Sequence, residues 1–295
     1  MKNKYFKYLY FLILIFVNSN LNAETIFFDS KNIRVEQNGN LIFASNGVAN
    51  IPLNNLKIKG DKFIYDKLIS ELIVLDNVEY YDDEKNIYIE SQKLIYNEIE
   101  NKIFSKSDTF INVKDKYKIK SSDVLFDRNL NIIETNKKTD AEDESKNKFN
   151  FKNGLILDII NEIISSNKVL VKDINLNNYF FENSKIDLKT NEIVGREIFI
   201  DFEDAFFGNK KNDPLLKGKS ITSDNNETKI FKTVFSTCNK KNKNCRGWEL
   251  ESEIFTHNKI KKIFEYEKSW LKVFDQKLFY MPYFNHPDPS VKRKS

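Results

Sequence analysis

The chain has 295 residues, of which 40% are apolar, 14% aromatic and 31% charged. This length and apolar content suffice for one or two packed domains, so they exclude wholesale disorder and a collagen-like fibre. The formal charge is +4, and Lys2, Lys4 and Lys7 supply three of the positive charges. Because the rest of the chain is close to neutral, a nucleic-acid binder is not expected.

The first 23 residues are typical of an export signal. The three lysines precede an uncharged apolar run at residues 8–17, and Ala23 closes a short polar stretch. A bilayer core needs about 20 apolar residues, so the run indicates a signal peptide cleaved after Ala23 rather than a membrane span. An uncleaved anchor is the alternative, because Leu21 stands where a smaller residue is usual. We expect an exported protein whose mature chain begins at Glu24, without lipidation, because no cysteine follows the cut.

A repeat with apolar anchor positions follows the signal. An apolar residue recurs every 30 or 31 positions, and a second stands two positions before each. Two residues is the period of a strand with one buried face. The twelve anchor residues are Ile33, Val35, Phe63, Tyr65, Leu94, Tyr96, Val124, Phe126, Leu155, Leu157, Ile186 and Leu188.

Each repeat contains a second alternating stretch, as at residues 72–80 and 102–113, so a unit consists of two strands. Polar segments such as residues 82–86 are expected to be the turns between them. Since no unit has room for a crossover helix, the sheet should be antiparallel and the fold all-β. Residues 155–164 resemble a helix in isolation, but their place in the repeat favours a strand.

A pair of strands cannot bury its own apolar face, so the units must stack on one another. Two architectures satisfy this requirement. One is a β-sandwich whose core is filled by side chains. The other is an antiparallel β-jelly-roll or solenoid with an open apolar trough, and there the twelve anchor residues would form the lining and bind lipid. Periodicity does not separate the two.

The sequence carries little site chemistry. Cys238 and Cys245 are the only cysteines, and export permits a disulfide between them; pairing with cysteines outside the chain is the alternative. A zinc site needs about four ligands, and only His257 and His286 could join the cysteines, so no metal is expected. Neither histidine accompanies a nucleophile motif, so we expect no catalytic residue and no cofactor.

From Thr233 the repeat gives way to a distinctive series of motifs. They are Thr237-Cys238, Trp248, Phe279-Tyr280-Met281-Pro282-Tyr283-Phe284 and Arg293-Lys294-Ser295. This segment resembles the point of entry into the barrel in the LptD (organic solvent tolerance) family of outer-membrane lipopolysaccharide-assembly proteins. The upstream repeats resemble that family's OstA-like periplasmic domain.

The resemblance implies a signal peptide at residues 1–23, an OstA-like β-jelly-roll at 24–232 and a barrel-entry segment at 233–295. The family's barrel would follow, and this sequence lacks it, so we expect a fragment, a split gene product or a barrel-less relative. In the family the cysteine of the Thr-Cys motif is linked to a barrel cysteine.

The function implied is non-enzymatic lipopolysaccharide transport at the periplasmic face of the outer membrane. The implied partners are lipopolysaccharide, a periplasmic bridge protein joined by β-strand augmentation and, if a barrel is supplied, an outer-membrane lipoprotein plug. Two alternatives stay open. One is a stand-alone periplasmic bridge subunit, and the other is an exported β-solenoid enzyme acting on polysaccharide, which would need carboxylates gathered on one face.

Overall fold

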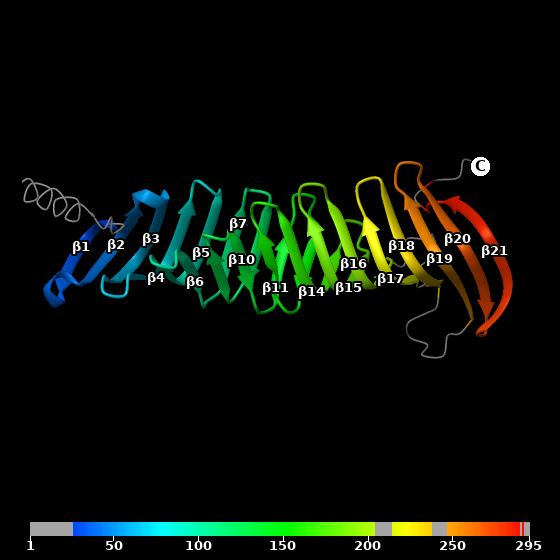
Figure 1. The fold of residues 1–295 in the computed structure, drawn as a ribbon, viewed down its shortest axis with the longest axis horizontal. Coiled ribbons are helices and arrows are strands. Elements are labelled where there is room, and N and C mark those ends of the chain that lie inside the picture. Colours follow the sequence, from blue (N-terminus) through cyan, green and yellow to red (C-terminus); the bar gives the residue numbers. More distant parts are fainter. Residues whose placement is uncertain (1–25, 204–213, 238–246, 290, 292–295) are drawn as a thin grey trace, which may run out of the picture.

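The computed structural model describes residues 26–203, 214–237, 247–289 and 291. These residues form one antiparallel sheet of 21 strands, so the all-β prediction is confirmed. Figure 1 shows an elongated molecule in which the strands follow one another along the long axis, from β1 at one end to β21 at the other. The expected signal peptide, Cys238, Cys245 and the last four residues lie outside the described residues.

The first part of the chain contains β1 (Phe27–Glu36), β2 (Leu41–Ile51), β3 (Leu56–Asp66), β4 (Glu71–Asp82), β5 (Ile87–Asn97), β6 (Lys102–Ser105), β7 (Thr109–Val113), β8 (Tyr117–Ser121), β9 (Val124–Asp127), β10 (Ile132–Thr135) and β11 (Thr139–Glu142). Two short 3-10 turns, η1 (Gln37–Gly39) and η2 (Pro52–Asn54), join the first three strands. The second part contains β12 (Lys148–Phe151), β13 (Ile156–Asp158), β14 (Ile163–Lys172), β15 (Asn178–Asp187), β16 (Glu192–Asp201), β17 (Leu215–Ser223), β18 (Glu227–Ser236), β19 (Trp248–Asn258), β20 (Ile263–Val273) and β21 (Gln276–Pro287).

The alternation of apolar and polar residues sets the inward face of each strand. Phe63 and Tyr65 are buried, whereas Ile64 between them is half-exposed, as expected when successive side chains point to opposite faces. The segment that resembled a helix forms β13, a turn at residues 159–162 and the start of β14, so the strand prediction holds at its two ends and not in its middle.

The sheet divides into two layers. The first half of β5 pairs with β7, and its second half pairs with β6. One branch then runs through β6, β9, β10 and β13 to β14, and the other runs through β7, β8, β11 and β12 to the same strand. The branch with β6 and β9 carries most of the anchor residues, so we call it the anchor layer and the other branch the opposite layer. Each long strand contributes one half to each layer.

The long strands bend at a corner between the layers. Residues with positive φ lie in the middle of every second long strand: Asn46, Asp76, Asn77, Lys168, Glu197, Lys232 and Lys268. The pairing register shifts beside Asp76 and Asn77, and the chain leaves the sheet altogether between β6 and β7 and between β10 and β11. Irregularities of this kind bend a strand and increase its twist, so their repetition folds the sheet lengthwise into a jelly roll.

Hydroxyl groups line the inside of this corner. The Ser91 hydroxyl lies 2.7 Å from that of Ser105, and the Thr135 hydroxyl lies 2.7 Å from that of Thr139. Because the backbone ladder is interrupted at the corner, polar groups would otherwise be buried without partners. Ser91 and Ser121, which stand five residues before the anchors Tyr96 and Phe126, therefore belong to the corner.

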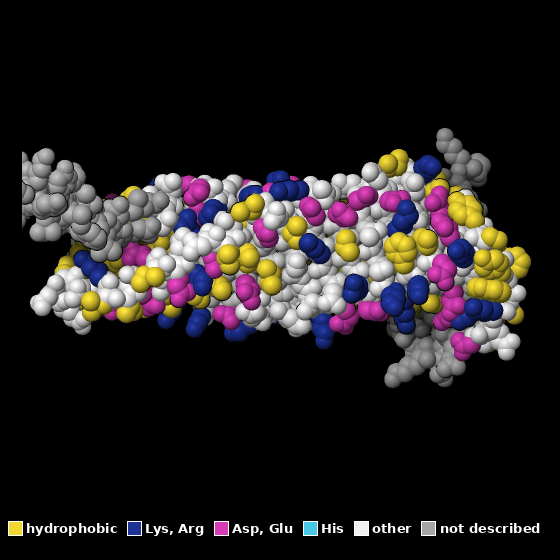
Figure 2. All heavy atoms as spheres, in the orientation of Figure 1, with side chains coloured by type: hydrophobic (Ala, Val, Ile, Leu, Met, Phe, Trp, Pro, Cys, Tyr) yellow, Lys and Arg dark blue, Asp and Glu magenta, His cyan; other side chains and the backbone are white. Residues whose placement is uncertain are grey.

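The sheet continues through residues 232 and 233, where the sequence suggested a domain boundary, because β18 spans both residues and β19–β21 extend the same sheet. The aromatic block at residues 279–284 lies in β21 and exposes several large apolar side chains, including Phe279 and Tyr283. Figure 2 shows apolar side chains gathered at the end of the molecule formed by β20 and β21. Among the described residues, no helix has the length and apolar character needed to span a bilayer.

Candidate functional site: an apolar cavity with a polar mouth

A cavity of about 610 Å³ lies between the two layers in the C-terminal half of the molecule. Strand β15 shows how the fold creates it: Tyr179 and Phe181 near its start and Ile186 near its end all line the cavity. An unbent ten-residue strand would span roughly 33 Å, so its two ends face one shared space only because the strand bends between the layers.

The walls of the cavity are apolar and come from both layers. They are formed by Phe149, Val171, Tyr179, Phe181, Ile186, Leu188, Ile193, Ile200, Phe202, Ile221, Ile230, Phe255 and Phe264. Most of these side chains are also part of the continuous buried core. A space with such walls favours an apolar occupant, and its volume is within the usual range of ligand pockets.

The mouth of the cavity is formed by polar turns. Two of them, at residues 143–147 and 173–177, close on themselves in the same way: the aspartate at the start accepts hydrogen bonds from the backbone and side-chain nitrogens of the asparagine four residues on. Asp224 does the same for the backbone nitrogens of Asn226 and Glu227, and these bonds lower the pKa of its carboxyl. The turns therefore hold their shape while leaving other amide groups at the rim.

Two basic side chains, His257 and Lys259, reach the C-terminal end of the cavity. His257 Nε2 lies 2.7 Å from Asp288 Oδ2, yet burial outweighs this carboxylate and lowers the pKa of the imidazole. Lys259 contacts the Ser223 hydroxyl at 3.1 Å and the carbonyl of Asp224, and burial lowers the pKa of its ammonium. Both groups line the cavity, so its C-terminal end carries two basic side chains.

In the N-terminal half the interior is packed. Phe63, Leu94, Tyr96 and Phe126 are each no more than 1% exposed. Of the twelve anchor residues, Ile186 and Leu188 line the cavity, and eight others are buried in the packed interior. Ile33 and Val35 are 51% and 56% exposed rather than enclosed, because β1 pairs only with β2 among the described strands and no described strand covers them from the other side. The two architectures left open by the sequence thus occur in one molecule, a filled half followed by a hollow half.

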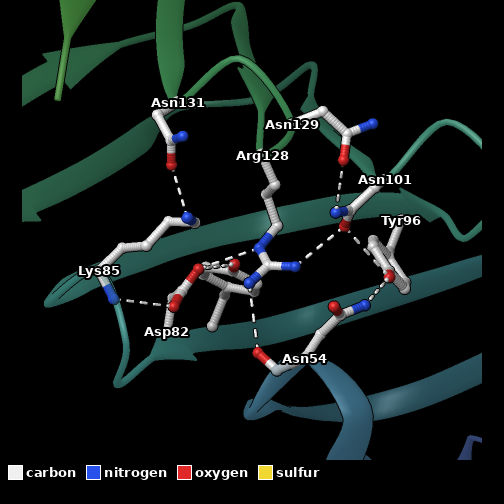
Figure 3. A network of polar contacts seen from close by, with 9 residues as sticks. Asn54, Asp82, Lys85, Tyr96, Asn101, Arg128, Asn129 and Asn131 are labelled. Atoms are coloured by element: carbon white, nitrogen blue, oxygen red, sulfur yellow. Dashed lines mark hydrogen bonds and ion pairs between the residues drawn. The ribbon is translucent and has the colours of Figure 1, made fainter. Parts of the chain in front are cut away.

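A buried ion pair joins the end of β4 in the opposite layer to the turn after β9 in the anchor layer, at the side of the packed half away from the corner. Arg128 Nε lies 3.0 Å from Asp82 Oδ2, and both side chains are at most 3% exposed. The guanidinium also donates to Asn101 Oδ1 at 2.9 Å and to the carbonyl of Asn54 at 3.2 Å (Figure 3). Tyr80 donates its hydroxyl to Asp82, and burial in this site raises the pKa of Tyr80, with Asp82 adding to the effect. The turn expected at residues 82–86 is present, and Asp82 at its start is a buried partner of Arg128 that also accepts a hydrogen bond from the backbone nitrogen of Lys85.

Sequence reasoning missed the cavity's polar rim and the ion pair. Asp143, Asp173 and Arg128 lie in turns, and nothing in the repeat distinguishes them from other polar turn residues. The pattern Asp-x-x-x-Asn, present at residues 143–147 and 173–177, was the available signal for two turns of the same shape. In the described part of the chain, no group of three or more histidine, cysteine or carboxylate residues is arranged to hold a metal ion.

Comparison with models of protein families finds none that matches the chain, and comparison with curated proteins finds no significant match.

Proposed function

We propose that this protein is a non-enzymatic carrier of lipopolysaccharide, which holds acyl chains in the cavity between its two layers during transport to the outer membrane. The observation that supports this proposal is the apolar cavity of about 610 Å³ beneath a rim of polar turns. An amphiphile needs this arrangement, because its acyl chains leave water while its head group stays at the surface.

Transfer of acyl chains into the cavity is favourable without any covalent step. Burial of a methylene group contributes about 0.8 kcal/mol, so several methylenes together give useful affinity. Binding of the lipid to the carrier remains reversible because each apolar contact is weak and non-directional. Reversibility suits a protein that must pass its cargo on.

The rim supplies hydrogen-bonding groups for a saccharide head group. Asn175 and Asn191 both border the cavity, and an amide side chain offers both a donor and an acceptor to sugar hydroxyls. Lys259 lies at the same rim and supplies a positive charge for a phosphate. We assign these side chains to the head group and the apolar walls to the acyl chains.

The exposed end at β1 is the expected contact with a periplasmic bridge protein. In the described residues β1 pairs with β2, which leaves its other edge available for a further strand. Ile33 and Val35 would then lie beside the partner's apolar inner face. The carrier and the bridge would share one continuous interior.

The proposal is tested by filling the cavity. Ile193 lines the cavity, whereas its neighbour Val194 is 44% exposed on the outer face. We expect Ile193→Trp to reduce binding of purified lipopolysaccharide at least tenfold, because the indole occupies space meant for acyl chains, and Val194→Trp to leave it unchanged. Equilibrium binding with labelled lipopolysaccharide measures both. Unchanged binding by a folded Ile193→Trp variant would contradict the proposal.

A stand-alone bridge subunit is the second candidate. It is favoured by β21, which pairs with β20 alone in the described part of the chain and therefore offers a second edge. A bridge needs an edge at each end of its sheet. Protection of β21 amides from hydrogen exchange on addition of a second periplasmic carrier would support this candidate over a chain that ends transport at the membrane.

A further inference from the structure

Polar contacts between the layers are concentrated at the mouth of the N-terminal half. Four of them follow one another along the molecule: Asp82–Arg128, Lys85–Asn131, Lys114–Glu162 and Tyr117–Leu188. In each, the first residue belongs to the opposite layer and the second to a turn or strand end of the anchor layer. We call these four contacts the clasp.

The clasp ends where the cavity begins. Tyr117 donates its hydroxyl to the carbonyl of Leu188 at 2.9 Å, and both residues line the cavity. Burial and the nearby Glu162 raise the pKa of Tyr117 to about 12, so the hydroxyl keeps the proton that it donates. The packed half and the hollow half are therefore separated by the last contact of the clasp.

The edge opposite the clasp is built as a hinge. The layers meet there at the corner, where the pairing register shifts and the chain leaves the sheet between β6 and β7 and between β10 and β11. The backbone pairing is already irregular along this line, which favours rotation of the two layers about it. Hinge motions use a few residues of this kind at the ends of regular elements.

We propose that the clasp and the corner form a gate, closed in this structure, that confines acyl chains to the C-terminal cavity and opens to let them pass through the N-terminal half. This inference rests on the proposed transport function. It concerns the route of the lipid, because a lipid delivered at the β1 end must cross the packed half before it reaches the cavity.

The energetics favour a gate over a permanent seal. Opening exposes apolar residues such as Leu94, Phe126 and Val74, but acyl chains entering between the layers would cover the same side chains. The cost that remains is that of breaking the clasp. A buried ion pair stabilises a closed structure no more than well-packed apolar side chains in its place would. It therefore favours one closed geometry without making closure irreversible.

The test maps where acyl chains lie. Lipopolysaccharide with a photoreactive diazirine on its acyl chains is bound to the full chain and irradiated, and the crosslinked peptides are identified by mass spectrometry. In the wild type we expect crosslinks in the peptides that contain Phe181 and Ile221, and at least tenfold fewer in those that contain Leu94 and Phe126. Comparable labelling of both sets would overturn the gate while supporting the carrier, and labelling of neither set would overturn the carrier itself.

Variants of the clasp then test its role. Asp82→Asn removes the charge that holds Arg128 and should raise labelling at Leu94 and Phe126 severalfold, whereas the paired variant Asp82→Leu/Arg128→Met replaces the ion pair with apolar contacts and should keep labelling low. Tyr117→Phe removes one contact without loss of volume and serves as the milder variant if Asp82→Asn does not fold. Labelling that stays at the wild-type level in folded Asp82→Asn or Tyr117→Phe would contradict the gate.

Discussion

At the scale of single residues, Asp82 and Arg128 show how polar groups are used inside this sheet. Each charge is buried, and each is accompanied by neutral partners: Tyr80 for the carboxylate, and Asn54 and Asn101 for the guanidinium. Burial opposes the charge on Arg128, but Tyr80 and Asp82 outweigh it and the pKa of the guanidinium is raised. Each side chain therefore has hydrogen-bonding partners inside the sheet, and loss of one member of the pair should destabilise the fold much more than loss of both.

The first prediction concerns the stability of this pair. Arg128→Met alone leaves the Asp82 carboxylate buried without its cation and should lower the free energy of unfolding by about 3–5 kcal/mol. The double variant Asp82→Leu/Arg128→Met should be close to the wild type, because it removes both charges. Urea denaturation of the wild type, Arg128→Met, Asp82→Leu and the double variant measures this. Additive losses in the double variant would show that the two side chains act independently.

His257 predicts a dependence of stability on pH. Burial holds its folded-state pKa below the ordinary value near 6.5, although Asp288 opposes the shift and Lys259 adds to it. Below pH 6.5 the unfolded chain therefore takes up this proton before the folded chain does, so stability present at neutral pH falls as the pH decreases.

Thermal unfolding between pH 7.5 and 5 provides the measurement. Wild-type protein should lose stability over this window, and His257→Gln should lose less. Asp158, Asp187 and Asp224, whose pKa values are lowered by backbone hydrogen bonds, act only near and below pH 4. A stability curve of His257→Gln parallel to that of the wild type down to pH 5 would rule out His257 as the source.

At the scale of elements, the corner between the layers decides the shape of every long strand. Gly60 lies at this corner in β3, and a Cβ atom added there would meet Val74 Cγ1 at 2.4 Å. Val74 is buried and belongs to the inner row of the anchor layer. The glycine is thus needed because the layers approach closely at the bend.

Substitution of this glycine should be costly. We expect Gly60→Ala to lower the free energy of unfolding by about 1–3 kcal/mol, the usual cost of overpacking a closely packed site. Gly247→Ala is the matched control, because an added Cβ there meets nothing within 4 Å, and it should change stability by less than about 0.5 kcal/mol. Equal losses of unfolding free energy for the two substitutions would show that the close contact at Gly60 does not limit stability.

The sequence predicts the elements well and the cavity poorly. Alternation with period two places Phe63, Tyr65, Leu94 and Phe126 on the inner face, and the structure buries all of them. Whether an inner face encloses a packed core or a hollow depends on the distance between the layers, which turns far apart in the sequence determine. Arg128 and Asp82 are 46 residues apart, so no local pattern relates them.

At the scale of the whole molecule, the fold is a sheet with two ends and one interior. The anchor residues of the first unit, Ile33 and Val35, are exposed because no described strand lies beyond β1. If a bridge protein adds its strand there, the amides of β1 should become protected from hydrogen exchange, and Ile33→Asp should weaken the association more than the outward-facing substitution Arg34→Asp. Protection absent from β1 in the presence of the bridge protein would argue against this edge as the contact.

Transport through the interior requires lipid to lie between the two layers beside Phe181. Phe181 is 4% exposed and lines the cavity, whereas Phe180 points to the outer face and packs against Phe199. The two are neighbours of the same type on β15, so a photoreactive phenylalanine analogue placed at either position differs only in the face that it samples. Irradiation with lipopolysaccharide should give a crosslinked product at position 181 and little or none at position 180. Equal products at the two positions, or a product at 180 alone, would contradict transport through the interior.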